Sequence, residues 1–205
     1  MGMFYYLLRP ATVVGGLDRP FYTYKMKLTS YVVVLLLLVC AVSVSAQSAA
    51  NWTEFKDEDL GVQVLFPGSI SRSSEMIETE TGKKFSVTYT STAGGLVFML
   101  SAAEIPEGKG LAVKDLFDGG REGMLSIGAD AKVTAEKDVK VDGRSARDIS
   151  VATKELAMRT RLFYVDGRLY QALATFSPAM SKDAKATAEV TKFIDSVKFT
   201  ASSAK

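Results

Sequence analysis

Apolar and polar residues alternate in several segments of the first half of the chain. The segment GVQVLFPG places Val62, Val64 and Phe66 at every second position, and a Pro67-Gly68 pair ends the run. The segment KFSVTYTS repeats this alternation at residues 84–91. A period of two is that of a β-strand with one buried face. The segment LVFMLSAAEI at residues 96–105 is apolar nearly throughout, which predicts a strand that is buried on both faces.

Helical spacing of apolar residues occurs in two later segments. It first appears at residues 111–127, which predicts a helix. The pair Gly119-Gly120 lies inside this helix, and each interior glycine costs ~1 kcal/mol relative to alanine. We therefore expect a break or kink at that point. A second helix is predicted at residues 181–195, and a short strand at 196–200 follows it.

Four strand-like runs lie between the two helices, at residues 132–141, 144–153, 156–165 and 168–176. The tetrapeptide VDGR joins them in two places, at 141–144 and 165–168. Asp-Gly between alternating runs predicts a type I′ hairpin turn, because both central residues need a positive φ. Such turns set Asp138 opposite Arg147 and Phe163 opposite Tyr170. A repeated binding element is the alternative interpretation of the tetrapeptide.

The composition is that of a globular protein with one core. The chain has 205 residues, of which 47% are apolar and 23% are charged. Residues 1–46 hold four of the 25 basic and one of the 23 acidic residues, so the rest has 21 against 22 and a net charge of −1. This balance does not favour a nucleic acid partner or an anionic membrane surface.

Residues 26–46 have the order of a secretory signal peptide. Lys25 and Lys27 flank its start, an apolar run covers 31–44, and Val44-Ser45-Ala46 suits cleavage after Ala46. We therefore expect a periplasmic or secreted protein. The alternatives are a lipoprotein acylated at Cys40 and an uncleaved membrane anchor, although the run is short for the roughly 20 residues that a spanning helix needs.

The residues before and after this segment are assigned to four further parts of the chain. We interpret residues 1–25 as an upstream extension, spurious or disordered, and residues 47–51 as a linker. Residues 52–200 are expected to form one globular domain, and residues 201–205 a disordered tail.

Side chains for common catalytic chemistry are missing after residue 46. Cys40 is the only cysteine and the sequence has no histidine. This excludes Cys/His zinc sites, thiol nucleophiles and Ser-His-Asp triads from the domain. Acidic residues at 57–59 and at 75, 78 and 80 could offer oxygen ligands to Ca²⁺. They lack the spacing of a calcium loop, so we expect no metal and no cofactor.

Arginines on one strand are the candidates for a binding site. Arg159 and Arg161 point to the same face of their strand, and Tyr170 on the neighbouring strand lies on that face too. Two guanidinium groups could clamp an anion or a carboxylate of a partner. The alternative is that the arginine stems cover a half-buried sheet face.

Four segments between Phe55 and Phe199 carry a resemblance to a known family: FKDEDLGVQVLFPG, VKVDGRSARDI, RTRLFYVDGRLYQALATF and FIDSVKF. In this order they resemble the PsbP-like family and its exported bacterial members. The resemblance implies an α+β fold in which helices flank an antiparallel β-sheet, an α-β-α sandwich. It also implies docking or assembly rather than catalysis, and it offers no catalytic motif to transfer.

Three functions are compatible with these observations. The first expectation is a noncatalytic module that docks on another protein of the bacterial cell envelope. The second is a carrier or sensor of a small apolar or anionic ligand, held between the sheet and a helix. The third is a hydrolase that uses carboxylates such as Asp148 or Glu155, which would have to lie at a defined separation.

Overall fold

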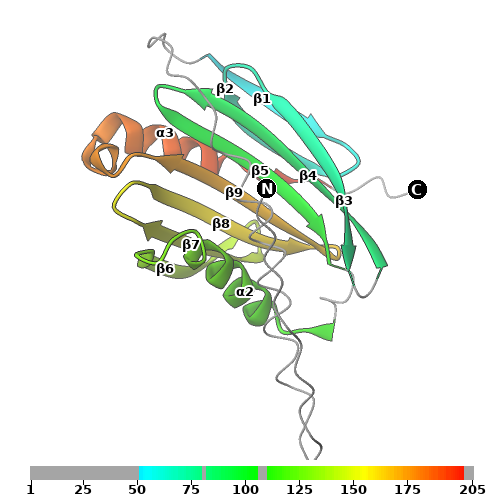
Figure 1. The fold of residues 1–205 in the computed structure, drawn as a ribbon. Helices are drawn as coiled ribbons and strands as arrows, with labels where there is room; N and C mark the ends of the chain where they lie inside the picture. The colour runs from blue at the N-terminus through cyan, green and yellow to red at the C-terminus, as the bar shows by residue number, and fades with distance from the viewer. Residues whose placement is uncertain (1–50, 80–81, 106–109, 201–205) are drawn as a thin grey trace, which may run out of the picture.

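The computed structural model describes residues 51–79, 82–105 and 110–200, which fold around a seven-stranded antiparallel sheet (Figure 1). The predicted upstream extension at 1–25, the signal peptide at 26–46, the tail at 201–205 and all but the last residue of the linker lie outside the described residues. Within the described ranges, no helix has the length and apolar character needed to cross a membrane.

The larger sheet contains all four of the strand-like runs that were predicted between the helices. Its strands, in spatial order, are β3 (Ser71–Thr79), β4 (Gly82–Ala93), β5 (Leu96–Glu104), β9 (Arg168–Phe176), β8 (Ala157–Val165), β7 (Arg144–Ala152) and β6 (Lys132–Val141). The predicted strands at 84–91 and 96–105 are confirmed as β4 and β5. The interior strand β5 is buried on both faces over most of its length, as expected.

Both VDGR segments are hairpin turns. The first joins β6 to β7 with φ of 50° at Asp142 and 77° at Gly143, and the second joins β8 to β9 with nearly the same pair of angles. Positive φ at both central residues is the mark of the type I′ turn. The register sets Asp138 opposite Arg147 and Phe163 opposite Tyr170, as predicted.

A smaller three-stranded sheet covers part of the larger one. It consists of β1 (Trp52–Asp57), β2 (Val62–Pro67) and β10 (Lys198–Phe199), with β2 in the middle. The predicted alternation in β2 is confirmed, because Val62, Val64 and Phe66 are all buried. This sheet brings the two ends of the described chain together, which the sequence pattern did not indicate.

The first predicted helix is α2 (Val113–Leu125), and it runs without a break through the two glycines. A Cβ atom on Gly120 would lie 2.6 Å from Cδ1 of Leu162 on β8. Real atoms do not approach so closely, so glycine is what allows the helix to lie against the sheet at this point. The expected break is therefore absent, and close packing explains why one of the glycines is there.

The second predicted helix is α3 (Ala184–Asp195), shorter than expected at its start. A short 3₁₀ turn, η3 (Pro178–Lys182), occupies the residues before it. The carboxylate of Asp183 caps the helix by accepting a hydrogen bond of 2.8 Å from the backbone N–H of Ala186. An N-cap aspartate satisfies a donor that has no partner within the helix, which fixes where α3 begins.

The helices pack against different faces of the larger sheet. On one face, Phe117 and Met124 of α2 join a core that includes Met158 and Leu162 of β8. On the other face, α3 and β2 share a larger core with residues of β8 and β9 whose side chains point away from α2. The α+β class is thus confirmed. The smaller sheet lies with α3 on the same face of the larger sheet. The expected α-β-α sandwich did not include this second sheet.

Candidate functional site

The three residues predicted from the sequence lie on one face of β8 and β9, but their polar groups serve separate contacts. Arg159 and Arg161 point toward α3, where Nη1 of Arg159 donates a hydrogen bond of 3.2 Å to the hydroxyl of Thr191. Tyr170 is buried, and its hydroxyl donates a hydrogen bond of 2.8 Å to the carbonyl oxygen of Leu60. Burial raises the pKa of this tyrosine above its usual value.

Arg161 is paired with two carboxylates. Its Nε and Nη2 donate to the two oxygens of Asp148 at 2.5 and 2.9 Å, and its Nη1 donates to Asp195 of α3 at 2.9 Å. Hydrogen bonding to Asp148 raises the pKa of Arg161, outweighing burial, which lowers it. One cation and two anions give this group a net charge of −1. The two carboxylates already occupy the guanidinium, so the geometry favours a role in tying β7, β8 and α3 together.

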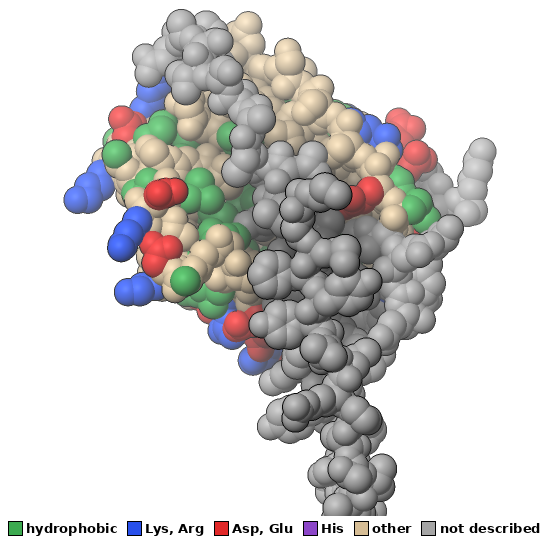
Figure 2. All heavy atoms as spheres, in the orientation of Figure 1, with side chains coloured by type: hydrophobic (Ala, Val, Ile, Leu, Met, Phe, Trp, Pro, Cys, Tyr) green, Lys and Arg blue, Asp and Glu red, His purple; other side chains and the backbone are tan. Residues whose placement is uncertain are grey.

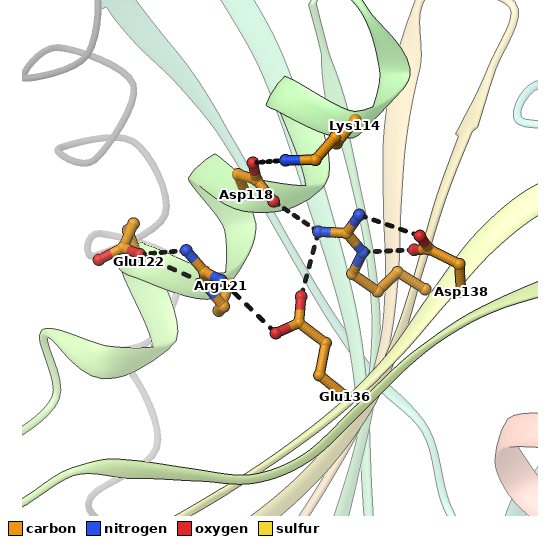
Figure 3. Close-up of polar contacts among 7 residues, drawn as sticks. Lys114, Asp118, Arg121, Glu122, Glu136 and Asp138 are labelled. Atoms are coloured by element: carbon orange, nitrogen blue, oxygen red, sulfur yellow. Dashed lines mark hydrogen bonds and ion pairs between the residues drawn. The ribbon is translucent and has the colours of Figure 1, made fainter.

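A second arginine lies at the centre of a larger charged cluster that the sequence alone did not reveal (Figure 3). Arg147 of β7 has only 6% of its side chain exposed. Its guanidinium donates to Asp118 of α2 at 2.6 Å, to Glu136 at 3.1 Å and to Asp138 at 2.6 Å. It also lies 5.6 Å from the ring centroid of Phe117. These contacts fasten α2 to the β6–β7 hairpin.

The outer members of the cluster extend the network along α2. Lys114 pairs with Asp118 at 2.6 Å, and Arg121 bridges Glu122 at 2.7 Å and Glu136 at 3.5 Å. Burial is the largest influence on the pKa of Asp118 and raises it. Hydrogen bonds from Lys114 and Arg147 act the other way, and the net pKa lies below its usual value. The pair Asp138–Arg147 was predictable from the hairpin register, whereas Asp118 comes from a distant segment.

In the acidic cluster at residues 57–59, which was considered for Ca²⁺, Asp57 forms hydrogen bonds within the fold. One oxygen of Asp57 accepts the backbone N–H of Leu60 at 3.0 Å, and the other accepts the hydroxyl of Tyr89. Arg72 of β3 donates to the same hydroxyl at 3.3 Å. In the described part of the chain, no group of three or more Cys, His, Asp or Glu residues is arranged to hold a metal ion.

The two carboxylates named for a hydrolase do not form a pair. Asp148 lies within β7 and is held by Arg161, whereas Glu155 follows the end of that strand in an exposed turn. Ala152, the end of β7, lies four positions after Asp148, a rise of roughly 13 Å along the strand, and Glu155 follows it. Both oxygens of Asp148 are bonded to Arg161, so Asp148 does not present the free carboxyl group that a glycosidase pair requires.

One buried polar group lacks a partner on the face of the sheet that α2 covers in part. Gln171 of β9 is 5% exposed, and its Nε2 makes no hydrogen bond within the described structure. Its neighbours across the strands are Ser101 of β5 and Leu162 of β8. A buried amide without a partner is unfavourable by about 1 to 3 kcal/mol, so it is a position where a ligand oxygen would be stabilising.

Comparison with solved structures places the fold. The solution structure of cyanobacterial PsbP (CyanoP) from Synechocystis sp. PCC 6803 is similar with a TM-score of 0.55 at 13% sequence identity, and the match covers 77% of this chain and 98% of that one. A protein of unknown function from Pseudomonas aeruginosa, described as a putative regulator, matches with a TM-score of 0.41 at 10% identity, over 69% and 94% of the two chains.

The chain therefore has a PsbP-like α+β fold, which confirms the resemblance seen in the sequence. No protein-family model and no curated protein sequence matches it. At such low identity the similarity concerns the fold, and function has to be argued from the site.

Proposed function

We propose that this protein is a noncatalytic docking module that binds another protein of the bacterial cell envelope. The observation that carries the proposal is the internal use of its arginines. Arg147 and Arg161 are each held by at least two carboxylates, so they fix the sheet and helices relative to one another. Arginines that are held inside the fold make the scaffold rigid. A rigid scaffold presents a preformed surface, so binding a partner costs less conformational entropy.

The surface charge supports a protein partner over nucleic acid. On the face seen in Figure 2, basic and acidic side chains of the described residues lie next to one another, and no broad area of one sign is visible. The PsbP-like fold adds to this, because the resemblance to that family implies docking. We also infer the α-β-α sandwich, from the packing of α2 and α3 against opposite faces of the larger sheet.

Export is the second part of the proposal. Residues 26–46 would act as a signal peptide, removed after Ala46, and deliver the domain to the periplasm or the exterior. An uncleaved anchor facing the same side is the alternative. Both versions place the domain beside envelope proteins.

The test is capture from the producing cells with the full chain carrying a C-terminal tag. After chemical cross-linking, we expect the tagged protein in the envelope or periplasmic fraction, starting at or near Gln47, with one envelope protein enriched. A matched chain that lacks residues 26–46 should stay in the cytoplasm and lose that partner. Recovery of the intact chain in the cytoplasm, or of no enriched envelope protein, would contradict the proposal.

A carrier of a small ligand is the second candidate, and Gln171 favours it. A free buried amide N–H suits a carbonyl or carboxylate oxygen of a ligand held beside α2. Native mass spectrometry of the purified protein should then show a bound small molecule that the Gln171→Leu variant lacks. The control is Gln63→Leu on β2, where the amide already bonds to Glu54. If Gln171→Leu only raises stability and no ligand is present in either form, the carrier function fails.

A further inference from the structure

The outer edge of β3 is open in the described structure. β3 is the last strand of the larger sheet, and it pairs with β4 alone, in one continuous register from Ser71 to Thr79. Every described side chain from Ser71 to Met76 is exposed, and 57% of Met76 is exposed to solvent. An edge strand offers a row of free backbone N–H and C=O groups to any other strand that reaches it.

The opposite edge of the same sheet is protected, which makes the open edge unusual. β6 is interrupted by a register shift between Val133 and Ala135. It also carries five charged residues, which are Lys132, Glu136, Lys137, Asp138 and Lys140. Bulges and charges are the devices by which natural sheets prevent pairing at an edge. β3 has no register shift, and it carries three charged residues against the five of β6, together with three serines.

We propose that β3 is a self-association edge, at which a second copy of this chain adds its own β3 in antiparallel orientation about a twofold axis at Ser73. The larger sheets of the two copies would then form one continuous sheet across the dimer. A partner with the same sequence is favoured because the strand is complementary to itself in this register.

Geometry restricts the possible registers. A twofold axis perpendicular to the sheet keeps each face continuous across the dimer, so opposite residues must have positions of the same parity. An axis at Arg72 would place two arginines opposite each other, and an axis at Glu75 two glutamates, and both arrangements are destabilising. Between Arg72 and Glu75, this leaves Ser73 and Ser74 as positions for the axis.

The axis at Ser73 gives compatible pairs at the first three steps on either side of it. Arg72, which also contacts Tyr89 of its own chain, and Glu75 each lie opposite a serine hydroxyl. The exposed Met76 lies opposite Ile70, an apolar residue that precedes β3 and packs partly against the core. The pairs between the two copies are Arg72 with Ser74, Ser71 with Glu75, and Ile70 with Met76. Cross-strand pairs of these kinds each contribute to sheet stability.

Sedimentation velocity of the full chain over a range of concentrations tests the proposal. We expect a concentration-dependent dimer, and at least a tenfold weaker association in Ser73→Lys and in Ser73→Glu, because each sets like charges opposite one another at the axis. A mixture of the two variants should dimerise again, since lysine then faces glutamate. The matched control is Ala135→Lys, which adds the same charge to the exposed β6 edge and should dimerise like the parent chain.

Circular dichroism and thermal unfolding must show that the variants remain folded, as expected for exposed positions. A parent chain that is monomeric at all concentrations would overturn the proposal, and so would a dimer that Ser73→Lys leaves unchanged. If the mixed variants stay monomeric, the axis does not lie at Ser73. The outcome is independent of whether an envelope protein is captured.

Discussion

At the scale of single residues, Gly143 tests the interpretation of the VDGR turns. Its φ is 77°, and no atom lies within 4 Å of where a Cβ would be, so a side chain there costs only backbone strain. We predict that Gly143→Val lowers the free energy of unfolding by roughly 1 to 3 kcal/mol in urea titrations.

The neighbouring residue provides the control for that change. The guanidinium of Arg144 lies 5.5 Å from the ring centroid of Phe199, a contact that contributes about 0.5 to 1 kcal/mol at exposed sites. Arg144→Ser should therefore cost less than Gly143→Val. The opposite order would mean that the tetrapeptide is retained for its arginine and not for its turn.

At Gly120 the cost of a side chain comes from lack of space and not from the backbone φ angle. The predicted contact of 2.6 Å between an added Cβ and Leu162 should make Gly120→Val destabilising by about 1 to 3 kcal/mol, through overpacking between α2 and β8. In a Leu162→Ala background the same change should cost less, which a double-mutant cycle measures. Gly110→Val is the control, because no atom lies near its Cβ position. Equal costs in both backgrounds would contradict the packing explanation.

At the scale of elements, Arg147 holds α2 against the β6–β7 hairpin. Replacing it by methionine keeps most of the volume but leaves Asp118, Glu136 and Asp138 close together without their shared cation. We predict a loss of roughly 3 kcal/mol in the free energy of unfolding. Lys140→Met on the exposed edge of β6 is the control and should change little. A neutral Arg147→Met variant would show that the cluster does not fasten the helix.

The same contact predicts a response to acid. The pKa of Asp118 lies below its ordinary value of 3.8 in the folded protein. The ionised form is thus stabilised on folding, and this stability is fully present above 3.8 and is lost as the pH falls through the folded pKa. Asp118→Asn should be less stable than the parent at pH 7, and the difference should narrow in unfolding titrations carried out below 3.8. A difference that does not change with pH would exclude this linkage.

The elements that the sequence did not predict share a physical cause. β3 is exposed on both faces at Ser71–Met76 and β1 shows no regular alternation of burial, so neither carries the period that identifies a strand. β5 and the hairpins were predictable because burial and turn chemistry are local. The Arg147 cluster was only half predictable, since the hairpin register gives Asp138, whereas Asp118 is 29 residues away in sequence.

At the scale of the whole molecule, the order of the segments between Phe55 and Phe199 was sufficient to predict the PsbP-like fold. The placement of β1 and β10 on either side of β2 was not, because two strands from opposite ends of the domain meet there. The candidate site was harder still. Arg159, Arg161 and Tyr170 do share a face, but α3 and Leu60 supply their partners, and only tertiary structure brings those together.

The composition of the whole domain leads to a last prediction, that its stability does not depend on a metal. Soft and borderline metals bind mainly to imidazole and thiolate, but the sequence has no histidine and its only cysteine is Cys40. Asp57 already accepts two internal hydrogen bonds, which weakens the remaining case for Ca²⁺. We expect no stoichiometric metal in the purified chain by elemental analysis, and the same melting temperature with and without a strong chelator. A fall of several degrees in chelator, reversed by Ca²⁺ and not by Zn²⁺, would instead assign an oxygen-ligand site to the acidic residues near Asp57.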